Sequence, residues 1–307
     1  MIQPKRSIST SFLFAFSLMA LAQSYTGPII DMHLHDYTQE NHYAVPAKDG
    51  TMPPINVSDF RAEVMRYIAK HNIVKAMVSP AAGLMDLDEN NVFIPGYMTE
   101  QPPTDTTAFK ELIISGKMKV FGEIGAIYGG YTLSDPAFEP YLNICERYDI
   151  PVAVHTGGGP QETTFRCCPH FRLKLGDPLE IEDVIVKYPK LRIYMMHAGE
   201  VFYENALRLM AMYPKLYADL GVLLWVDVMP MDYAERFLKK AKQYGLIDQI
   251  MFGSDQMVWP HAIEKSINTL NGYDFLSSED KEKIFYSNAA RFMRLSDEEV
   301  AKHQSED

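Results

Sequence analysis

Residues 31–35, Asp-Met-His-Leu-His, decide the fold of this chain, because three later stretches of the sequence end in a similar way. These stretches are 152–155 (VAVH), 193–197 (IYMMH) and 250–255 (IMFGSD). In each of them, hydrophobic residues lead into a histidine or an aspartate at a turn. The strands of a parallel sheet are buried on both faces and read as apolar runs, and barrel enzymes carry catalytic groups at the carboxyl ends of such strands. The pattern therefore predicts parallel strands that bring polar side chains to one end of a barrel.

His33 and His35 are the clearest pair of candidate metal ligands. Side chains two residues apart in a strand point to the same side, so both imidazoles can reach one divalent ion while Leu34 turns the other way to pack. Histidine together with carboxylate ligands suits zinc, and also iron or manganese. Taken alone, the pair fits ordinary surface or core histidines with hydrogen-bond partners equally well. The matching strand ends downstream favour a metal site.

The composition is that of an ordinary globular enzyme, with 47% hydrophobic and 22% charged residues among 307. This length fits one large barrel as readily as two small domains. There are 40 acidic and 29 basic residues, which gives a net charge of −11. Because an acidic chain repels phosphate backbones, the composition argues against nucleic acid as a substrate.

The N-terminal segment differs from the rest of the chain. Basic residues 5–6 precede the apolar residues 12–22, and residues 20–22 (Ala-Leu-Ala) place small side chains just before a potential cleavage point. This pattern predicts a secretory signal peptide at residues 1–22, too short for a confident membrane span. The mature protein would be a single domain, residues 23–307, exported to the periplasm or secreted, with no stable membrane insertion. An uncleaved anchor or a disordered tail is the alternative.

The chain has 3 cysteines, which is too few for a disulfide framework. Cys145 lies in a helical pattern and is expected in the core. Cys167 and Cys168 are adjacent, and neighbouring cysteines can bridge only through a strained ring. We therefore expect this pair to be free thiols in a loop, with a redox role as the alternative.

The apolar and turn patterns predict eight strands separated by helices. We expect the strands at residues 29–35, 73–78, 92–97, 119–125, 151–155, 191–197, 216–220 and 249–252. We expect the helices at residues 58–71, 104–115, 135–148, 178–188, 205–213, 232–244, 260–270 and 278–294. Ser58 is the expected N-cap of the first helix, and residues 36–57 should form a long loop over the site. The alternation predicts a (β/α)₈ TIM barrel, although the third strand is weak.

Candidate ligands fall at the ends of five of these strands: His33 and His35, Glu123, His155, His197, and Asp255. This arrangement resembles the amidohydrolase superfamily of metal-dependent barrel hydrolases. The fragments at 31–35, 155–157 (HTG), 197–199 (HAG) and 253–255 (GSD) are most similar to the amidohydrolase-related branch, which also contains the aminocarboxymuconate-semialdehyde decarboxylase type. Residues 286–292 (YSNAARF) resemble the closing helix of that branch, and the likeness spans nearly all of residues 27–295.

Glu123 departs from the decarboxylase pattern. Residues 122–125, Gly-Glu-Ile-Gly, resemble a motif of TatD-like deoxyribonucleases, in which the glutamate bridges two metals. If Glu123 does so here, His33, His35 and Asp255 would hold one ion, and His155 and His197 the other. If it does not, the likeness to the decarboxylase branch implies one ion on His33, His35, His155 and Asp255, with His197 beside the bound water. A third reading makes Glu123 a salt-bridged carboxylate inside the barrel, because a buried unpaired glutamate would be costly.

The expected chemistry is hydrolysis of a small molecule, namely a lactone, ester, amide or phosphoester. One or two divalent ions, zinc first and manganese or iron as alternatives, would activate water and polarise the bond that breaks. The resemblance implies that Asp255 takes the proton from water and passes it to the leaving group. In the arrangement with a single metal, His197 would stabilise the developing oxyanion. A metal-dependent non-oxidative decarboxylase is the closest rival. A catalytically inactive binding protein is the alternative from another class, and the acidic charge disfavours a nuclease.

The predicted substrate contacts come from loops that follow the strand ends. Arg166, His170 and Arg172 are candidate anchors for an anion, because arginine binds carboxylate or phosphate with two parallel hydrogen bonds. Tyr128, Tyr131 and Trp259 are candidates for the walls of an apolar pocket. Solvated loop charges and ordinary aromatic packing are the respective alternatives. Three further histidines end no apolar run and are not expected to be ligands: His42, His71 and His261. The oligomeric state stays open.

Overall fold

Eight short parallel strands form the barrel that the sequence predicts. The computed structural model describes residues 24–225 and 232–305. The strands are β1 (Ile29–Leu34), β2 (Ile73–Val78), β3 (Phe93–Pro95), β4 (Phe121–Ile124), β5 (Val152–His155), β6 (Ile193–Met196), β7 (Leu216–Asp219) and β8 (Ile250–Met251). Neighbouring strands pair in parallel from β1 to β3 and from β4 to β8. The predicted signal peptide lies outside the described residues.

Two further connections close the ring of strands. Parallel bridges from Gly96 to Val120 and from Thr99 to Ile124 join the third and fourth strands. The Met32 N–H donates to the Phe252 carbonyl over 2.9 Å, which joins the eighth strand to the first. The predicted TIM barrel is therefore confirmed, and the weak third strand is a real but short one.

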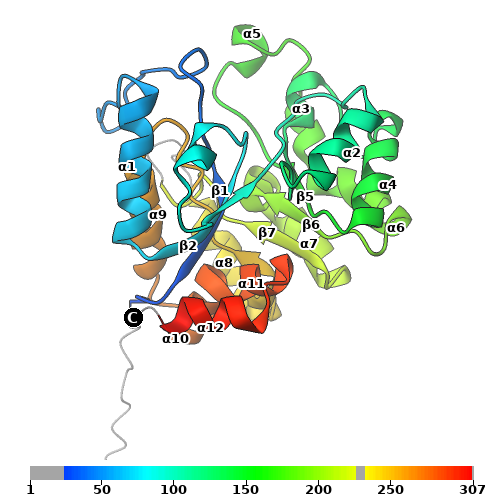
Figure 1. Ribbon diagram of the computed structural model, residues 1–307. Coiled ribbons are helices and arrows are strands. Elements are labelled where there is room, and N and C mark those ends of the chain that lie inside the picture. Colours follow the sequence, from blue (N-terminus) through cyan, green and yellow to red (C-terminus); the bar gives the residue numbers. More distant parts are fainter. Residues whose placement is uncertain (1–23, 226–231, 306–307) are drawn as a thin grey trace, which may run out of the picture.

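Helices surround the strands (Figure 1). They are α1 (Val57–Lys70), α2 (Thr106–Ile114), α3 (Ala126–Gly129), α4 (Glu139–Tyr148), α5 (Thr163–Arg166), α6 (Glu182–Lys187), α7 (Tyr203–Met212), α8 (Tyr233–Tyr244), α9 (His261–Asn271), α10 (Ser278–Glu282), α11 (Asn288–Met293) and α12 (Asp297–Ser305). The helix expected over residues 278–294 is interrupted by a π-helical turn, Lys283–Ser287. No helix among the described residues is long and apolar enough to cross a bilayer.

Asn56, and not Ser58, caps the first helix. The Asn56 backbone is extended, and its side chain accepts a hydrogen bond from the Asp59 N–H over 2.8 Å. That bond satisfies one of the free N–H groups of the first turn, so Ser58 lies inside the helix. The prediction placed the start of the helix too late because both residue types are good caps.

Two hydrophobic layers hold the barrel. Alternate strand residues, among them Leu34 and Val78, pack outward against the helices. Met32, Ala153 and Met196 fill the interior below the predicted ligands, together with Phe292 of α11. Figure 1 shows α11 and α12 together at one end of the molecule, so the C-terminal segment covers the end of the barrel that lies away from the ligands. The strands consequently place their carboxyl ends at the open end.

The cysteines agree with the prediction only in part. Cys145 is buried in the core, as expected. Cys167 and Cys168 are joined in a disulfide, with their Cα atoms 3.8 Å apart, so the prediction of free thiols is wrong. The Cys167 and Cys168 N–H groups both donate to the Thr163 carbonyl. This folds the chain back at the end of α5 and brings the two sulfurs together.

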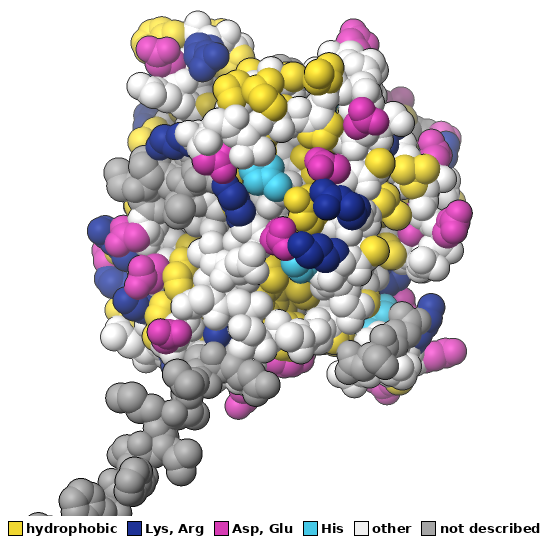
Figure 2. All heavy atoms as spheres, turned by 90° about the vertical axis from the view of Figure 1, so that its left-hand side faces the viewer, with side chains coloured by type: hydrophobic (Ala, Val, Ile, Leu, Met, Phe, Trp, Pro, Cys, Tyr) yellow, Lys and Arg dark blue, Asp and Glu magenta, His cyan; other side chains and the backbone are white. Residues whose placement is uncertain are grey.

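The surface carries mixed charge. In Figure 2, lysine and arginine side chains are interspersed with aspartate and glutamate over the visible face and form no continuous basic patch there.

Candidate metal centre

His33 and His35 project from the end of β1 with one ring nitrogen each directed at the other predicted ligands. The His33 Nδ1 lies 3.1 Å from Oδ2 of Asp219, and the His35 Nδ1–H donates to the Ser79 carbonyl over 2.5 Å. Because these partners are acceptors, Nδ1 carries the proton and Nε2 keeps a free lone pair. The His33 Nε2 is buried and has no hydrogen-bond partner among the described residues. Metal-binding histidines are commonly oriented in this way.

Asp255 completes a three-residue group with this pair. Its Oδ1 lies 2.9 Å from the His35 Nε2 and 3.7 Å from the His33 Nε2. The Asp255 N–H donates to the His33 carbonyl over 2.7 Å, so the loop after β8 is tied directly to β1. The ligand atoms of these three residues all lie within 4.8 Å of one another. A buried unpaired nitrogen facing a carboxylate fits a divalent cation, which would satisfy both.

The Glu123 carboxylate spans two pairs of histidines. Its Oε2 lies 3.6 Å from the Nε2 atoms of both His33 and His35. Its Oε1 lies 2.6 Å from the His155 Nδ1 and 3.5 Å from the His197 Nε2. One oxygen therefore faces each pair, which is the position that a bridging ligand requires.

Only glycine fits before Glu123. A Cβ atom on Gly122 would lie 2.3 Å from the Cβ of Ala153 on the neighbouring strand. The Glu123 N–H donates to the Ser79 hydroxyl over 2.6 Å, and that hydroxyl donates to the Gly122 carbonyl over 2.7 Å. Ser79 thus fixes the backbone at Glu123 while its carbonyl orients His35. The local Gly-Glu sequence is explained by close packing between β4 and β5.

His155 and His197 direct lone pairs at the same carboxylate. The His155 Nε2–H donates to the Gly158 carbonyl over 2.6 Å, and the His197 Nδ1–H donates to the Gly221 carbonyl over 3.1 Å. The remaining nitrogens lie 3.0 Å apart. Together with Oε1 of Glu123 they form three converging acceptors. Only a shared proton or a cation between them makes this arrangement favourable.

The electrostatics of the cluster favour a bound cation. Burial raises the pKa of Glu123, but the hydrogen bond with His155 and the nearby imidazoles of His197 and His33 outweigh it and hold this pKa well below its usual value. Burial likewise raises the pKa of Asp255, and the charge of His33 and contact with His35 outweigh it. Burial lowers the pKa of His33, but Asp255, Asp219 and Glu123 raise it well above the ordinary value. Both carboxylates are therefore ionised, and His33, His35 and His197 bind protons where no metal ion replaces them.

A cavity of about 620 Å³ opens above these ligands. Its lining includes Tyr128, as predicted, and a largely apolar wall made by Tyr37, Pro80, Met98, Pro160, Val222 and Met257. Burial raises the pKa of Tyr128, so its hydroxyl stays neutral. Three charged residues outside the predicted ligand set also line the cavity: Lys48, Glu100 and Glu200.

The other five predicted substrate residues do not line this cavity. The indole N–H of Trp259 donates to the Val45 carbonyl, and Arg172 donates to the Pro169 and Phe171 carbonyls. Arg166 is exposed on α5. His170 and Arg172 line a separate surface hollow together with Tyr131. The structure does not bring these five side chains to the metal centre: Arg166, His170, Arg172, Tyr131 and Trp259.

Besides the charged lining residues Lys48, Glu100 and Glu200, two further residues of the site were missed in the sequence, Asp219 and Tyr37. Asp219 ends β7 after an apolar run, which is the same signal that identified the other ligands. Tyr37 follows the His33-Leu34-His35 motif almost directly and lines the cavity. Asp219 could have been found by applying the strand-end rule to every predicted strand.

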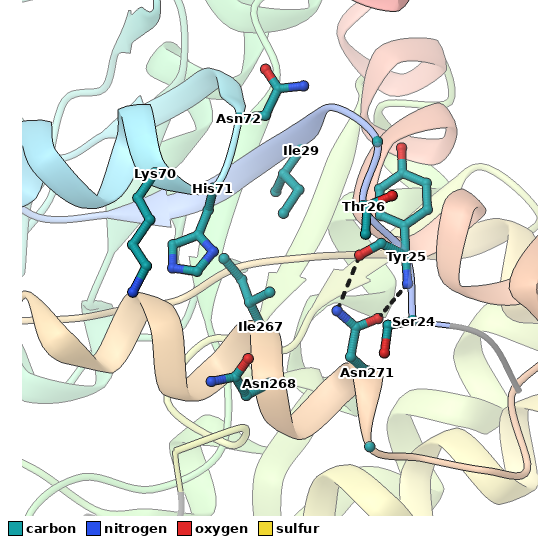
Figure 3. A pocket seen from close by; sticks show the side chains of 12 residues that line it. Ser24, Tyr25, Thr26, Ile29, Lys70, His71, Asn72, Ile267, Asn268 and Asn271 are labelled. Carbon is teal, nitrogen blue, oxygen red and sulfur yellow. Dashed lines mark hydrogen bonds between the residues drawn. The ribbon is translucent and has the colours of Figure 1, made fainter. Parts of the chain in front are cut away.

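A second hollow, of about 440 Å³, lies at the amino end of β1 and β2 (Figure 3). There the Tyr25 N–H donates to Oδ1 of Asn271, and the Asn271 amide donates to the Tyr25 carbonyl. His71 borders this hollow and not the metal centre, in agreement with the sequence prediction. These contacts fasten the start of the described chain to α9.

Comparison with known proteins identifies the family. The family model described as amidohydrolase matches residues 30–295. A search of curated proteins returned no match.

Several solved structures have a similar fold. An uncharacterized TIM-barrel protein from Bordetella bronchiseptica has a TM-score of 0.65 at 18% identity, over 87% of this chain and 98% of that chain. A probable 2-pyrone-4,6-dicarboxylic acid hydrolase from Acinetobacter baumannii has a TM-score of 0.59 at 14% identity, over 87% and 99%. A 5-carboxyvanillate decarboxylase from Novosphingobium aromaticivorans, solved with manganese, has a TM-score of 0.53 at 16% identity, over 89% and 99%. Because the family model spans most of the chain, including every predicted metal ligand, this protein belongs to the amidohydrolase family of TIM-barrel enzymes.

Proposed function

We propose that this protein is a metal-dependent hydrolase of a small molecule with a lactone, ester, amide or phosphoester bond. The observation that carries the proposal is the position of Glu123. One of its oxygens faces His33 and His35, and the other faces His155 and His197. A carboxylate placed in this way supports two adjacent cation sites, which is the arrangement that binds the attacking and leaving oxygens of a hydrolytic reaction.

The donor set defines which residues would hold the ions. His33, His35 and Asp255 would hold one of them, and His155 and His197 the other, with Glu123 shared. Divalent ions bound there, zinc before manganese or iron, would supply Lewis-acid polarisation and activation of water. The histidines contribute uncharged nitrogen ligands because backbone carbonyls and Asp219 fix the proton on the opposite ring nitrogen.

Asp255 is the group that accepts and returns the proton. It is 2% exposed and lines the cavity. Burial raises its pKa, but the charged imidazoles outweigh this in the metal-free protein, and a bound divalent cation would take over that role. A carboxylate at this position can take a proton from water and deliver it to the departing alcohol or amine. The apolar wall, including Met98, Val222 and Met257, would orient the organic part of the substrate and exclude bulk water.

A non-oxidative decarboxylase with one ion is the second candidate function. It is favoured by the engagement of both His155 nitrogens, one with the Gly158 carbonyl and one with Glu123. The fold similarity to a 5-carboxyvanillate decarboxylase also supports it. In this arrangement Glu123 would serve as a hydrogen-bond partner of His155. The single ion would then be held by His33, His35 and Asp255, without the His155 ligand that the resemblance to the decarboxylase branch implies.

Metal analysis of the purified protein separates the two functions. For the hydrolase we expect about two ions per chain, falling to one or fewer in Glu123→Gln, together with activity on an ester, lactone and phosphoester panel. One ion per chain, unchanged by the substitution, would favour the decarboxylase. The absence of metal after supplementation with zinc and manganese would exclude both mechanisms.

We also propose that residues 1–22 direct export of the enzyme. The proposal is supported by their basic start, apolar stretch and small residues before Gln23. N-terminal sequencing of the protein from the exported fraction should start at Gln23. Recovery of the intact chain in the cytoplasm would contradict it.

A further inference from the structure

Lys48 is the one lysine or arginine among the described residues that line the cavity over the metal centre. It is exposed and comes from the long loop between β1 and α1. Within residues 24–225 and 232–305, its ammonium group has no ion pair or hydrogen bond. A cation without a partner at the mouth of a catalytic cavity is available to a ligand.

The backbone under Lys48 is held firmly by its neighbours. The Ala47 N–H donates to the Thr51 carbonyl over 2.8 Å, and the Gly50 N–H donates to the Ala47 carbonyl over 2.9 Å. Asp49 accepts from the Thr51 N–H and forms an ion pair with Lys265 of α9. These contacts close a tight turn without using the Lys48 side chain. The turn therefore fixes the backbone of Lys48 beside the cavity and leaves its ammonium group free.

Carboxylates occupy other parts of the rim. Glu100 comes from the segment after β3 and lies close to Gly125, which follows β4. A Cβ atom placed on that glycine would be 3.8 Å from the Glu100 Cγ. Glu200 follows β6 and already accepts a hydrogen bond from the Gly158 N–H. The rim is thus divided by charge, with the cation on the β1–α1 loop and the carboxylates on segments that follow β3 and β6. An anionic group entering the cavity is attracted to Lys48 and repelled by Glu100 and Glu200.

We propose, building on the hydrolase function above, that Lys48 binds an anionic group of the substrate that is remote from the bond being hydrolysed. The substrate class is then an organic anion with an apolar body, which the wall of Met98, Val222 and Met257 covers. A lysine ammonium binds either a carboxylate or a phosphate, because it acts as a point charge. Lys48 would determine specificity through binding and take no part in bond breaking.

Matched substrates test this assignment. The metal-loaded protein is assayed with 4-acetoxybenzoate, with 4-acetoxyphenylphosphonate and with the neutral 4-acetoxyacetophenone, so that the acetate ester is the one hydrolysable bond and only the remote group differs. In Lys48→Met we expect KM for the two anions to rise roughly 3- to 10-fold and KM for the neutral ketone to stay within about 2-fold. A larger effect on the carboxylate or on the phosphonate identifies which type of anion the site prefers.

Control variants fix the sign of the effect. Lys48→Arg should keep KM for the anions near the wild-type value, whereas Glu100→Gln should lower it by about 2-fold because a repulsive charge is removed. Lys117→Met, another exposed lysine that does not line the cavity, should change none of the values. An equal change of KM for charged and neutral substrates in Lys48→Met, or no change, would overturn the proposal.

A binding measurement tests the role of Lys48 independently of the proposed hydrolase reaction. If wild-type protein hydrolyses none of the three esters, the hydrolase function is in doubt and calorimetry replaces the assay. We then expect 4-methoxybenzoate to bind Lys48→Met about 3- to 10-fold more weakly than wild type, with 4-methoxybenzamide unaffected. Equal binding of the anion by both proteins would refute the role of Lys48 whatever the reaction is.

Discussion

The Nδ1 atom of His33 lies 3.1 Å from Oδ2 of Asp219, so a buried carboxylate behind the candidate metal centre determines which nitrogen of His33 is free. The other oxygen of Asp219 accepts hydrogen bonds from the His197 and Gly221 N–H groups, each over 2.9 Å. One carboxylate at the end of β7 therefore positions ligands from β1 and β6. This makes Asp219 as important to the geometry as the predicted ligands themselves.

Asp219→Asn should weaken metal binding without unfolding the barrel. The asparagine oxygen can keep the two backbone bonds, but its amide N–H would donate to the His33 Nδ1 and move the proton to Nε2. Protonated Nε2 cannot bind an ion, so we expect metal affinity to fall roughly 10- to 100-fold. A competition titration against a zinc-binding dye measures this, with circular dichroism as the control for folding. Unchanged affinity would show that Asp219 does not set the tautomer.

Asp255→Asn should remove turnover and leave much of the metal in place. The amide cannot accept the proton from water, and loss of such a group reduces rates by roughly 10²- to 10⁴-fold. His33, His35 and Glu123 remain to hold an ion. Steady-state rates and elemental analysis of the same preparation provide the check. Complete loss of metal in a folded variant would reduce Asp255 to a ligand with no separate part in proton transfer.

Chelation of the metal should destabilise the protein. Removing the ion leaves Glu123 and Asp255 as buried carboxylates beside His33, His35 and His197, which must then be protonated. With metal at about 100 times its dissociation constant, binding contributes about 2.7 kcal/mol, which corresponds to a Tm change of roughly 5–10 °C. Calorimetric scans before chelation, after chelation and after addition of zinc or manganese measure it. An identical Tm in all three states would argue against a bound ion in the folded protein.

Gly176→Ala should displace the loop that borders the cavity. A Cβ on Gly176 would lie 1.9 Å from the Gly157 carbonyl oxygen, and the Gly157 N–H donates to the Gly176 carbonyl over 2.7 Å. We expect a loss of roughly 1–3 kcal/mol in the free energy of unfolding and a fall in kcat/KM, because Gly158 accepts from His155. Urea unfolding and kinetics are the measurements. Gly272→Ala is the matched control, since its nearest atom is 3.3 Å away, and it should be nearly neutral.

The positions of the strands could be predicted because a strand buried on both faces is a continuous run of apolar residues. The second strand was predicted with its observed bounds, Ile73–Val78, and the fifth differs only by the omission of Pro151. The ends of helices were harder, because several neighbouring residues can cap a first turn. Asn56 and Ser58 illustrate this, since only the extended backbone at Asn56 makes it the cap.

The disulfide and the residues that line the cavity could not be predicted reliably from the sequence, because they lie largely in loops. Loops carry no periodicity, so nothing in the sequence shows which of their side chains point inward. Arg172 donates to backbone carbonyls within its own loop, whereas Lys48 lines the cavity from the loop between β1 and α1. The adjacent sulfurs of Cys167 and Cys168 likewise meet because α5 ends in a tight turn.

By itself, the sequence determined the barrel and the residue types at its strand ends, because parallel strands need apolar runs and their carboxyl ends converge. It could not determine the distances between those ends. Only the tertiary structure decided that Glu123 faces both histidine pairs, that Asp219 orients His33, and that Lys48 stands at the rim. Such relationships depend on the register and packing of strands far apart in the chain, where a shift of one residue reverses every side chain.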